Sequence, residues 1–130
     1  MPVVARLRVR CCCTLGFVLT CIGARAQSVN ATMVGTIFDT SSAAIPQAKV
    51  TVTNKGTNVA RTVTGNERGD YTITNLAPGF YQLVAEHEGF RRTVVGEIEL
   101  LVNQTARLDL VLQVGAVSET VEVSSAGQLV

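Results

Sequence analysis

Residues 64–90 have the sequence TGNERGDYTITNLAPGFYQLVAEHEGF, in which two alternating segments lie between three groups of turn-forming residues. Apolar and polar residues alternate in both segments, which is the period-two pattern of a half-buried strand. We therefore expect strands at Tyr71–Thr74 and Tyr81–Ala85. Pro78 and Gly79 between them indicate a turn, because proline presets φ and glycine supplies a left-handed position. The region predicts a β-hairpin that strands from the rest of the chain cover.

Five further segments show a similar alternation, with more interruptions. They are Met33–Asp39, Ala48–Asn54, Val59–Thr64, Arg91–Val102 and Ala106–Val114. Val59–Thr64 is the most polar of them, which is typical of an edge strand, and Arg61 is suited to guard that edge against association with other sheets. Apolar doublets blur the alternation of Arg91–Val102, so we expect a β-bulge near Gly96.

The fold class follows from the number and spacing of these segments. Outside residues 1–26 no segment has apolar residues at helical spacing. Seven short strands separated by Gly, Pro and Asn turns predict an all-β, seven-stranded antiparallel Greek-key sandwich. About 100 residues suffice for one core, so we expect one domain at residues 31–114 and an extended linker at 115–130. The residues expected to face the core include Ala48, Val50, Val52, Tyr71, Tyr81, Val94, Ile98, Leu100, Ala106, Leu108, Leu110, Leu112 and Val114.

Residues 1–26 have the pattern of a secretory signal peptide. Three arginines precede Cys11–Ile22, a stretch without charge that is well short of the roughly 20 residues of a membrane-spanning helix. Ala24 and Ala26 then give the small-x-small pattern of a cleavage site before Gln27. We expect an exported protein.

Cysteine and charge distribution exclude several kinds of site. All four cysteines lie within residues 1–26, so the rest of the chain has no disulfide framework and no thiolate metal site. That remainder carries seven basic and ten acidic side chains, a net charge of −3. Its basic residues are scattered without a stripe or stacking aromatics, which argues against nucleic acid as a partner.

Catalytic residues are sparse. His87 is the only histidine, so a zinc site with paired histidines cannot be assembled, and a solvated loop position explains His87 better than a Ser-His-acid triad. Glu86, Glu88, Glu97 and Glu99 offer carboxylates for glycoside hydrolysis, but a solvent-facing strand edge explains them more simply. We expect no enzyme activity, no cofactor and no metal ion.

Five segments in order resemble the carboxypeptidase regulatory-like domain family, over roughly Ala31–Val114. They are Gly35–Asp39, Ile45–Val52, Thr64–Tyr71, Leu76–Tyr81 and Gly89–Phe90. Ser41–Ala44 departs from the pattern, because the family usually has a glycine turn there. The resemblance implies a prealbumin-like (transthyretin-like) sandwich without catalysis of its own.

Such a domain behind a signal peptide is similar to the amino-terminal extension of Oar-like TonB-dependent outer-membrane receptors. Gly115–Val123 resembles the link before the plug domain of those receptors, so the chain is either part of a longer receptor or acts alone. The resemblance implies a periplasmic module at the outer membrane, with scaffolding and interaction roles in transport. Its implied partners are the periplasmic energy-transducing protein and the receptor's own plug and barrel.

An extended segment can add itself to another protein's sheet through main-chain hydrogen bonds. By this analogy the candidate contact strand consists of Glu119, Thr120, Val121, Glu122 and Val123. An ordinary linker is an equally good interpretation of the same residues.

The alternative function is a free-standing carbohydrate-binding module with a glycan as its ligand. Phe80 and Phe90 lie beside turn glycines, where their rings are candidates for stacking on sugars. The chain contains no tryptophan, the residue that sugar platforms favour.

Overall fold

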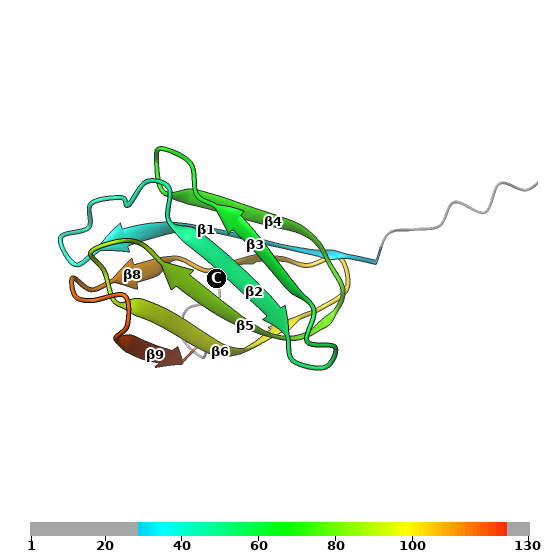
Figure 1. Cartoon of the computed structure of the whole chain (residues 1–130). Coiled ribbons are helices and arrows are strands. Elements are labelled where there is room, and N and C mark those ends of the chain that lie inside the picture. Colours follow the sequence, from blue (N-terminus) through cyan, green and yellow to red (C-terminus); the bar gives the residue numbers. More distant parts are fainter. Residues whose placement is uncertain (1–28, 125–130) are drawn as a thin grey trace, which may run out of the picture.

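The computed structural model describes residues 29–124, which form two β-sheets packed face to face (Figure 1). The predictions made for residues 1–26 and 125–130 therefore lie outside the described residues. No helix in the described part is long and apolar enough to cross a membrane. The strands are β1 (Ala31–Asp39), β2 (Lys49–Asn54), β3 (Ala60–Thr64), β4 (Asp70–Leu76), β5 (Gly79–Glu86), β6 (Arg92–Leu100), β7 (Thr105–Arg107), β8 (Leu110–Leu112) and β9 (Thr120–Ser124).

The sandwich is mixed rather than purely antiparallel. One sheet has the order β4-β1-β7, with β8 pairing further along β1, and the other has the order β3-β2-β5-β6-β9. β7 and β8 run parallel to β1, and β9 runs parallel to β6. The prediction of an all-β sandwich is confirmed, but the seven-stranded antiparallel arrangement is wrong. Alternation identifies the face on which a residue lies, and it carries no information about the direction of the neighbouring strand.

The predicted hairpin around Pro78 is also wrong. β4 pairs with β1, whereas β5 pairs with β2 and β6, so the two strands belong to opposite sheets. Two-residue hairpins need a positive φ at their first central residue, and proline cannot adopt it. The chain instead turns a corner between the sheets, and the Tyr81 hydroxyl donates a hydrogen bond of 2.6 Å to the Ala77 carbonyl there.

The core lies between the inner faces of the two sheets, and it confirms most of the predicted inward positions. Val50, Leu83 and Val95 are fully buried, and the two tyrosines Tyr71 and Tyr81 are nearly so. The bulge near Gly96 is confirmed, because two residues of β6, Gly96 and Glu97, lie opposite one residue of β5, Gln82, at this point. Val114 was expected in the core, but it is 72% exposed since the strand ends before it.

The predicted strand Ala106–Val114 is split into β7 and β8 at Leu108 and Asp109. Here the chain still bonds to β1, because the Leu108 N–H donates to the Val34 carbonyl at 2.8 Å. The Asp109 side chain then takes the place of a main-chain acceptor, with Oδ1 accepting from the Thr36 N–H at 2.8 Å. A carboxylate thus completes the ladder across the interruption.

We predict that ionisation of Tyr71 lowers the stability of the fold at alkaline pH. Its buried hydroxyl donates to the Leu108 carbonyl, and burial is the main reason that the pKa of Tyr71 is raised above its usual value. A folded-state pKa above the unfolded value of about 10 means that the stabilisation is complete below pH 10 and is lost as the pH rises further. Tyr71→Phe should cost about 1–3 kcal/mol at pH 7, because the Leu108 carbonyl loses its partner.

The same substitution should flatten the decline of stability between pH 9 and pH 11. Urea unfolding of both proteins across this range measures the difference. If the free energy of unfolding falls equally in both proteins, ionisation of Tyr71 does not contribute to the loss of stability.

Candidate strand-pairing edge

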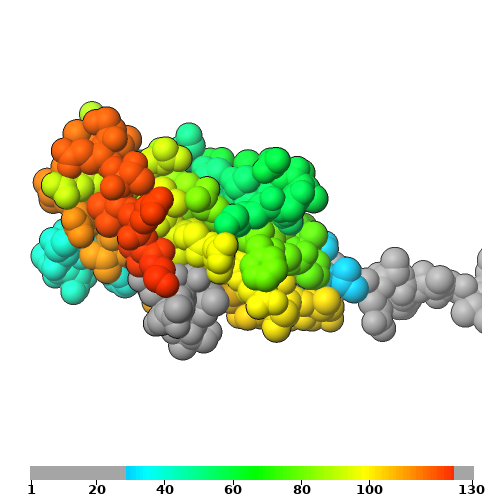
Figure 2. Space-filling model, turned by 90° about the horizontal axis from the view of Figure 1, so that it is seen from below, coloured from blue at the N-terminus to red at the C-terminus, as the bar shows by residue number. Residues whose placement is uncertain are grey.

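The segment predicted as a contact strand lies at the edge of the five-stranded sheet. Thr120–Ser124 forms β9, whose register with β6 runs from Arg92 opposite Thr120 to Gly96 opposite Ser124. Figure 2 shows β9, in red, at the surface of the molecule. The structure therefore keeps Thr120, Val121, Glu122 and Val123 together in one strand, with Glu119 just before it. The linker prediction did not include this pairing with β6.

The two faces of β9 differ in character. Val121 and Val123 are half-buried on the inner side, and Val123 packs against the core. Thr120 and Glu122 are exposed on the outer side of the sheet. The alternation seen in the sequence thus corresponds to a strand whose inner face covers part of the core and whose outer face is polar.

β9 is held in place by contacts that we call the Arg91 clasp, formed by Arg91, Gly115 and Glu119. Arg91 Nε lies 2.6 Å from Glu119 Oε2, within ion-pair distance although it is not aligned for a hydrogen bond. A Cβ on Gly115 would lie 2.5 Å from Cγ of Arg91, so glycine allows the arginine side chain to cross the backbone here. The sequence analysis had named Glu119 as part of the candidate contact strand, but it did not connect Glu119 with Arg91 or Gly115.

Main-chain hydrogen bonds support the clasp on both sides. The Arg91 N–H donates to the Gln113 carbonyl at 2.7 Å, and the Gly115 N–H donates to the Gly89 carbonyl at 3.1 Å. The Arg92 N–H donates to the Glu119 carbonyl at 2.9 Å, which starts the ladder between β6 and β9.

Replacing Gly115 by alanine tests the clasp. The added methyl should displace the flexible Arg91 side chain and weaken its ion pair with Glu119, which is partly exposed and contributes about 0.2–1 kcal/mol. Amide hydrogen exchange in β9 should then accelerate about two- to fivefold, while exchange in β2 stays unchanged as an internal control. Unaltered exchange in β9 would show that the clasp does not hold the strand.

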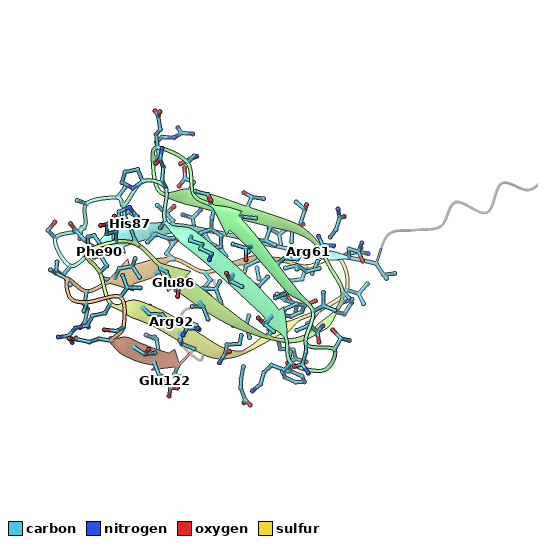
Figure 3. All side chains as sticks on the ribbon, in the orientation of Figure 1. Arg61, Glu86, His87, Phe90, Arg92 and Glu122 are labelled. Atoms are coloured by element: carbon cyan, nitrogen blue, oxygen red, sulfur yellow. The ribbon has the colours of Figure 1, made fainter. Side chains whose placement is uncertain are left out.

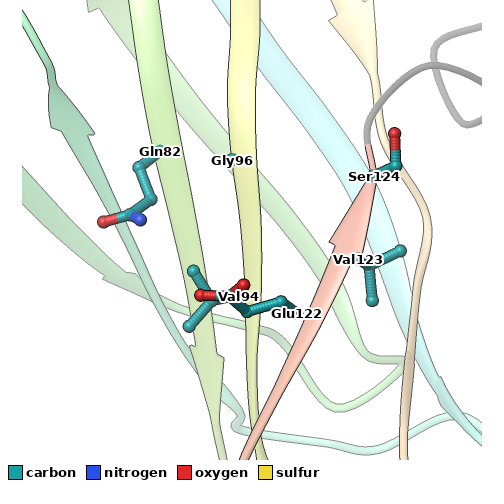
Figure 4. A pocket seen from close by; sticks show the side chains of 6 residues that line it. All are labelled: Gln82, Val94, Gly96, Glu122, Val123 and Ser124. Atoms are coloured by element: carbon teal, nitrogen blue, oxygen red, sulfur yellow. The ribbon is translucent and has the colours of Figure 1, made fainter.

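A shallow hollow of about 300 Å³ lies on the outer face beside β9 (Figure 4). It is lined by Gln82, Val94, Gly96, Glu122, Val123 and Ser124. The hollow exists because Gly96 has no side chain, and an added Cβ would meet nothing within 4 Å. Glu122 lies beside Val94, its register partner on β6. This surface thus combines the main chain of an edge strand with the acidic side chain of Glu122 and the small apolar side chain of Val94.

The structure does not bring the two candidate stacking residues together. Phe80 is 54% exposed near the start of β5. Phe90 follows the other end of β5, where it is half-buried and meets His87 edge to face with ring centroids 5.7 Å apart. A strand rises about 3.3 Å per residue, so the six steps from Phe80 to Glu86 alone place the two ends of β5 roughly 20 Å apart. The two rings do not form a common sugar platform.

Two of the residues considered for catalysis, His87 and Glu86, make ordinary surface contacts. His87 Nδ1 lies 2.9 Å from the Glu88 carbonyl, and Glu86 forms an ion pair of 3.3 Å with Arg92 on the outer face (Figure 3). Within residues 29–124 no three His, Cys, Asp or Glu side chains gather closely enough to hold a metal ion.

The sequence profile of the carboxypeptidase regulatory-like domain matches residues 32–113, which include both sheets from β1 to β8. The chain belongs to this family. Over 106 residues the chain is 35% identical to the TonB-dependent transporter Oar of Myxococcus xanthus. The match covers 80% of the chain and 10% of the transporter, so the chain spans about a tenth of the length of this curated relative.

Solved structures share the fold of this carboxypeptidase regulatory-like domain at low sequence identity. The TIE protein of Bacillus anthracis superposes with a TM-score of 0.57 at 22% identity, over 66% of this chain and 17% of that one. A hydroxyquinol 1,2-dioxygenase from Pseudomonas putida gives 0.55 at 10% identity, over 68% and 57% of the two chains. At these identities the likeness shows the fold alone.

Proposed function

We propose that this carboxypeptidase regulatory-like domain is a non-catalytic periplasmic module of a TonB-dependent outer-membrane receptor. In this role it serves as a scaffold and as a protein-interaction site during transport, in contact with the receptor's own plug and barrel. The observation that carries the proposal is the 35% identity to a TonB-dependent transporter over most of the chain.

The proposed interaction partner is the periplasmic domain of the TonB energy transducer. Support comes from β9, an exposed strand at a sheet edge, because such strands are bound by the addition of another strand. Glu122 on the outer side of β9 and a net charge of −3 over the described residues favour a basic partner segment.

A binding experiment with three chains tests this function. The full chain, a chain ending at Ser124 and a chain ending at Ala116 are titrated with a purified TonB periplasmic domain. The first two retain β9 and should bind alike, whereas loss of residues 117–130 should weaken binding at least tenfold. Circular dichroism verifies that the shortest chain still folds. Equal affinity of all three chains would remove the proposal.

A further inference from the structure

The edges of the two sheets differ in how they are protected. At one side of the sandwich, Arg61 Nη1 on β3 donates a hydrogen bond of 2.9 Å to the Thr74 carbonyl on β4 (Figure 3). A single guanidinium thus spans the edges of both sheets, which gives the predicted guard residue a definite bond. At the other side, β7 and β8 are three residues each and are interrupted at Leu108. Among residues 29–124, β9 is the longest continuous edge without such protection.

The hydrogen-bonding directions of β9 follow from its parallel register. The Glu119 carbonyl accepts from Arg92 on β6, and in a parallel ladder the same side of the strand is then used by Val121 and Val123. The N–H and carbonyl groups of Thr120 and Glu122 therefore point away from β6, toward the outer edge of the sheet. This edge offers a partner strand a ladder that does not compete with β6.

Withdrawal of β9 from its own sheet has a clear cost. Val123 packs against the core and lies opposite Val95, which is fully buried. Release would expose this apolar contact, leave the β6 main chain without its partner, and open the Arg91 clasp. Addition of a strand to the outer edge requires none of these losses. Addition of a partner strand to the outer edge is therefore favoured over withdrawal of β9 from its sheet.

Charges define the strand that fits this edge. Glu122 on the outer side of β9 forms no ion pair among the described residues. The nearest base on β6 is Arg92, which is already paired with Glu86. A matching strand carries Lys or Arg opposite Glu122 and β-branched apolar residues on the side of Val121 and Val123.

The geometry points to β9 as a docked acceptor strand: it stays bonded to β6 and receives a basic strand of the partner on its outer edge, so that the sheet grows from five strands to six. This inference rests on the proposed function for the identity of the partner. It adds that the partner binds the folded edge and does not extract the segment from the domain.

An engineered disulfide between β6 and β9 tests whether the partner adds a strand to β9 or pulls β9 out of its sheet. Val95→Cys and Val123→Cys are introduced into the full chain, in which the four native cysteines are replaced by serine. Neighbouring strands lie about 4.8 Å apart, inside the roughly 4.4–6.8 Å between Cα atoms that a disulfide spans. Oxidised and reduced forms of the same protein are then titrated with the TonB periplasmic domain. Dissociation constants within about twofold are expected, and a loss of tenfold or more on oxidation would overturn the inference.

A second pair of variants in the oxidised background tests the outer edge itself. Glu122→Pro removes the outward N–H while the disulfide holds β9 in place, so binding should fall more than tenfold. Glu122→Gln keeps the N–H and removes only the charge, so it should bind a few-fold more weakly and depend less on salt. Full binding by the proline variant would show that the partner docks elsewhere and would overturn the inference.

The outcomes distinguish this inference from the proposed function. If binding requires residues 117–130 but is abolished by the oxidised lock, the function stands and docked addition is excluded. If the unmodified chain does not bind the TonB domain at all, the proposed function fails, and the inference fails with it.

Discussion

Gly35→Ala should lower the free energy of unfolding by about 3 kcal/mol or more, the upper end of what overpacking costs. A Cβ at this position would lie 1.9 Å from the Leu108 carbonyl oxygen and 2.8 Å from the Tyr71 ring. Neither neighbour can move freely, because the same carbonyl accepts the Tyr71 hydroxyl and the Leu108 N–H is bonded to β1. The methyl group must therefore force β1 away from the segment between β7 and β8.

Gly96→Ala is the matched control, since it adds the same methyl group to a strand glycine with open space around it. Its unfolding free energy should change by no more than about 0.5 kcal/mol. Urea unfolding of both variants gives the comparison. Similar losses in the two proteins would show that the close approach at Gly35 is not a constraint on the fold.

Leu110→Ala should cost about 2–5 kcal/mol, the range for a buried leucine. Leu110 is 2% exposed and lies in β8 opposite Ile37 of β1, in the middle of the core. Truncation removes apolar contacts and leaves a cavity that the two sheets cannot close without moving together.

The neighbouring residue provides the control for this substitution. Val111 is 53% exposed on the same short strand, so Val111→Ala should change stability by only about 0.5 kcal/mol or less. Thermal unfolding of the two variants decides the point. A Val111 variant as unstable as the Leu110 variant would mean that β8 depends on strand propensity rather than on burial.

The face of most residues was predictable from the sequence, although Val94, which was expected in the core, lies on the outer face beside β9. The strand pairings were not predictable. Alternation places Val50 and Leu110 inward regardless of which strand lies beside them, because period two is a local property. Pairing depends on corners and crossovers, and the Pro78 corner was misread as a hairpin because a proline followed by a glycine is typical of several kinds of turn. The break at Leu108 depends on a bond from Asp109 to Thr36, far away in the sequence.

The candidate site was predictable in the same partial way. The sequence predicted Glu119–Val123 as a candidate strand that another chain can pair with. Its docking on β6 was not predictable, because the Arg91 clasp joins residues from two separate connections, and no sequence pattern links Arg91 to Gly115 or Glu119.

The parallel register of β9 on β6 also determines how the joint responds to mechanical tension. The register extends over five residue pairs. A pull on Ser124 along the strand axis loads all of these hydrogen bonds in shear, so they must rupture together. A pull perpendicular to the axis would open them one after another. If the proposed transducer binds at β9, the direction of its pull decides whether the force is carried into the sandwich or β9 peels away from β6.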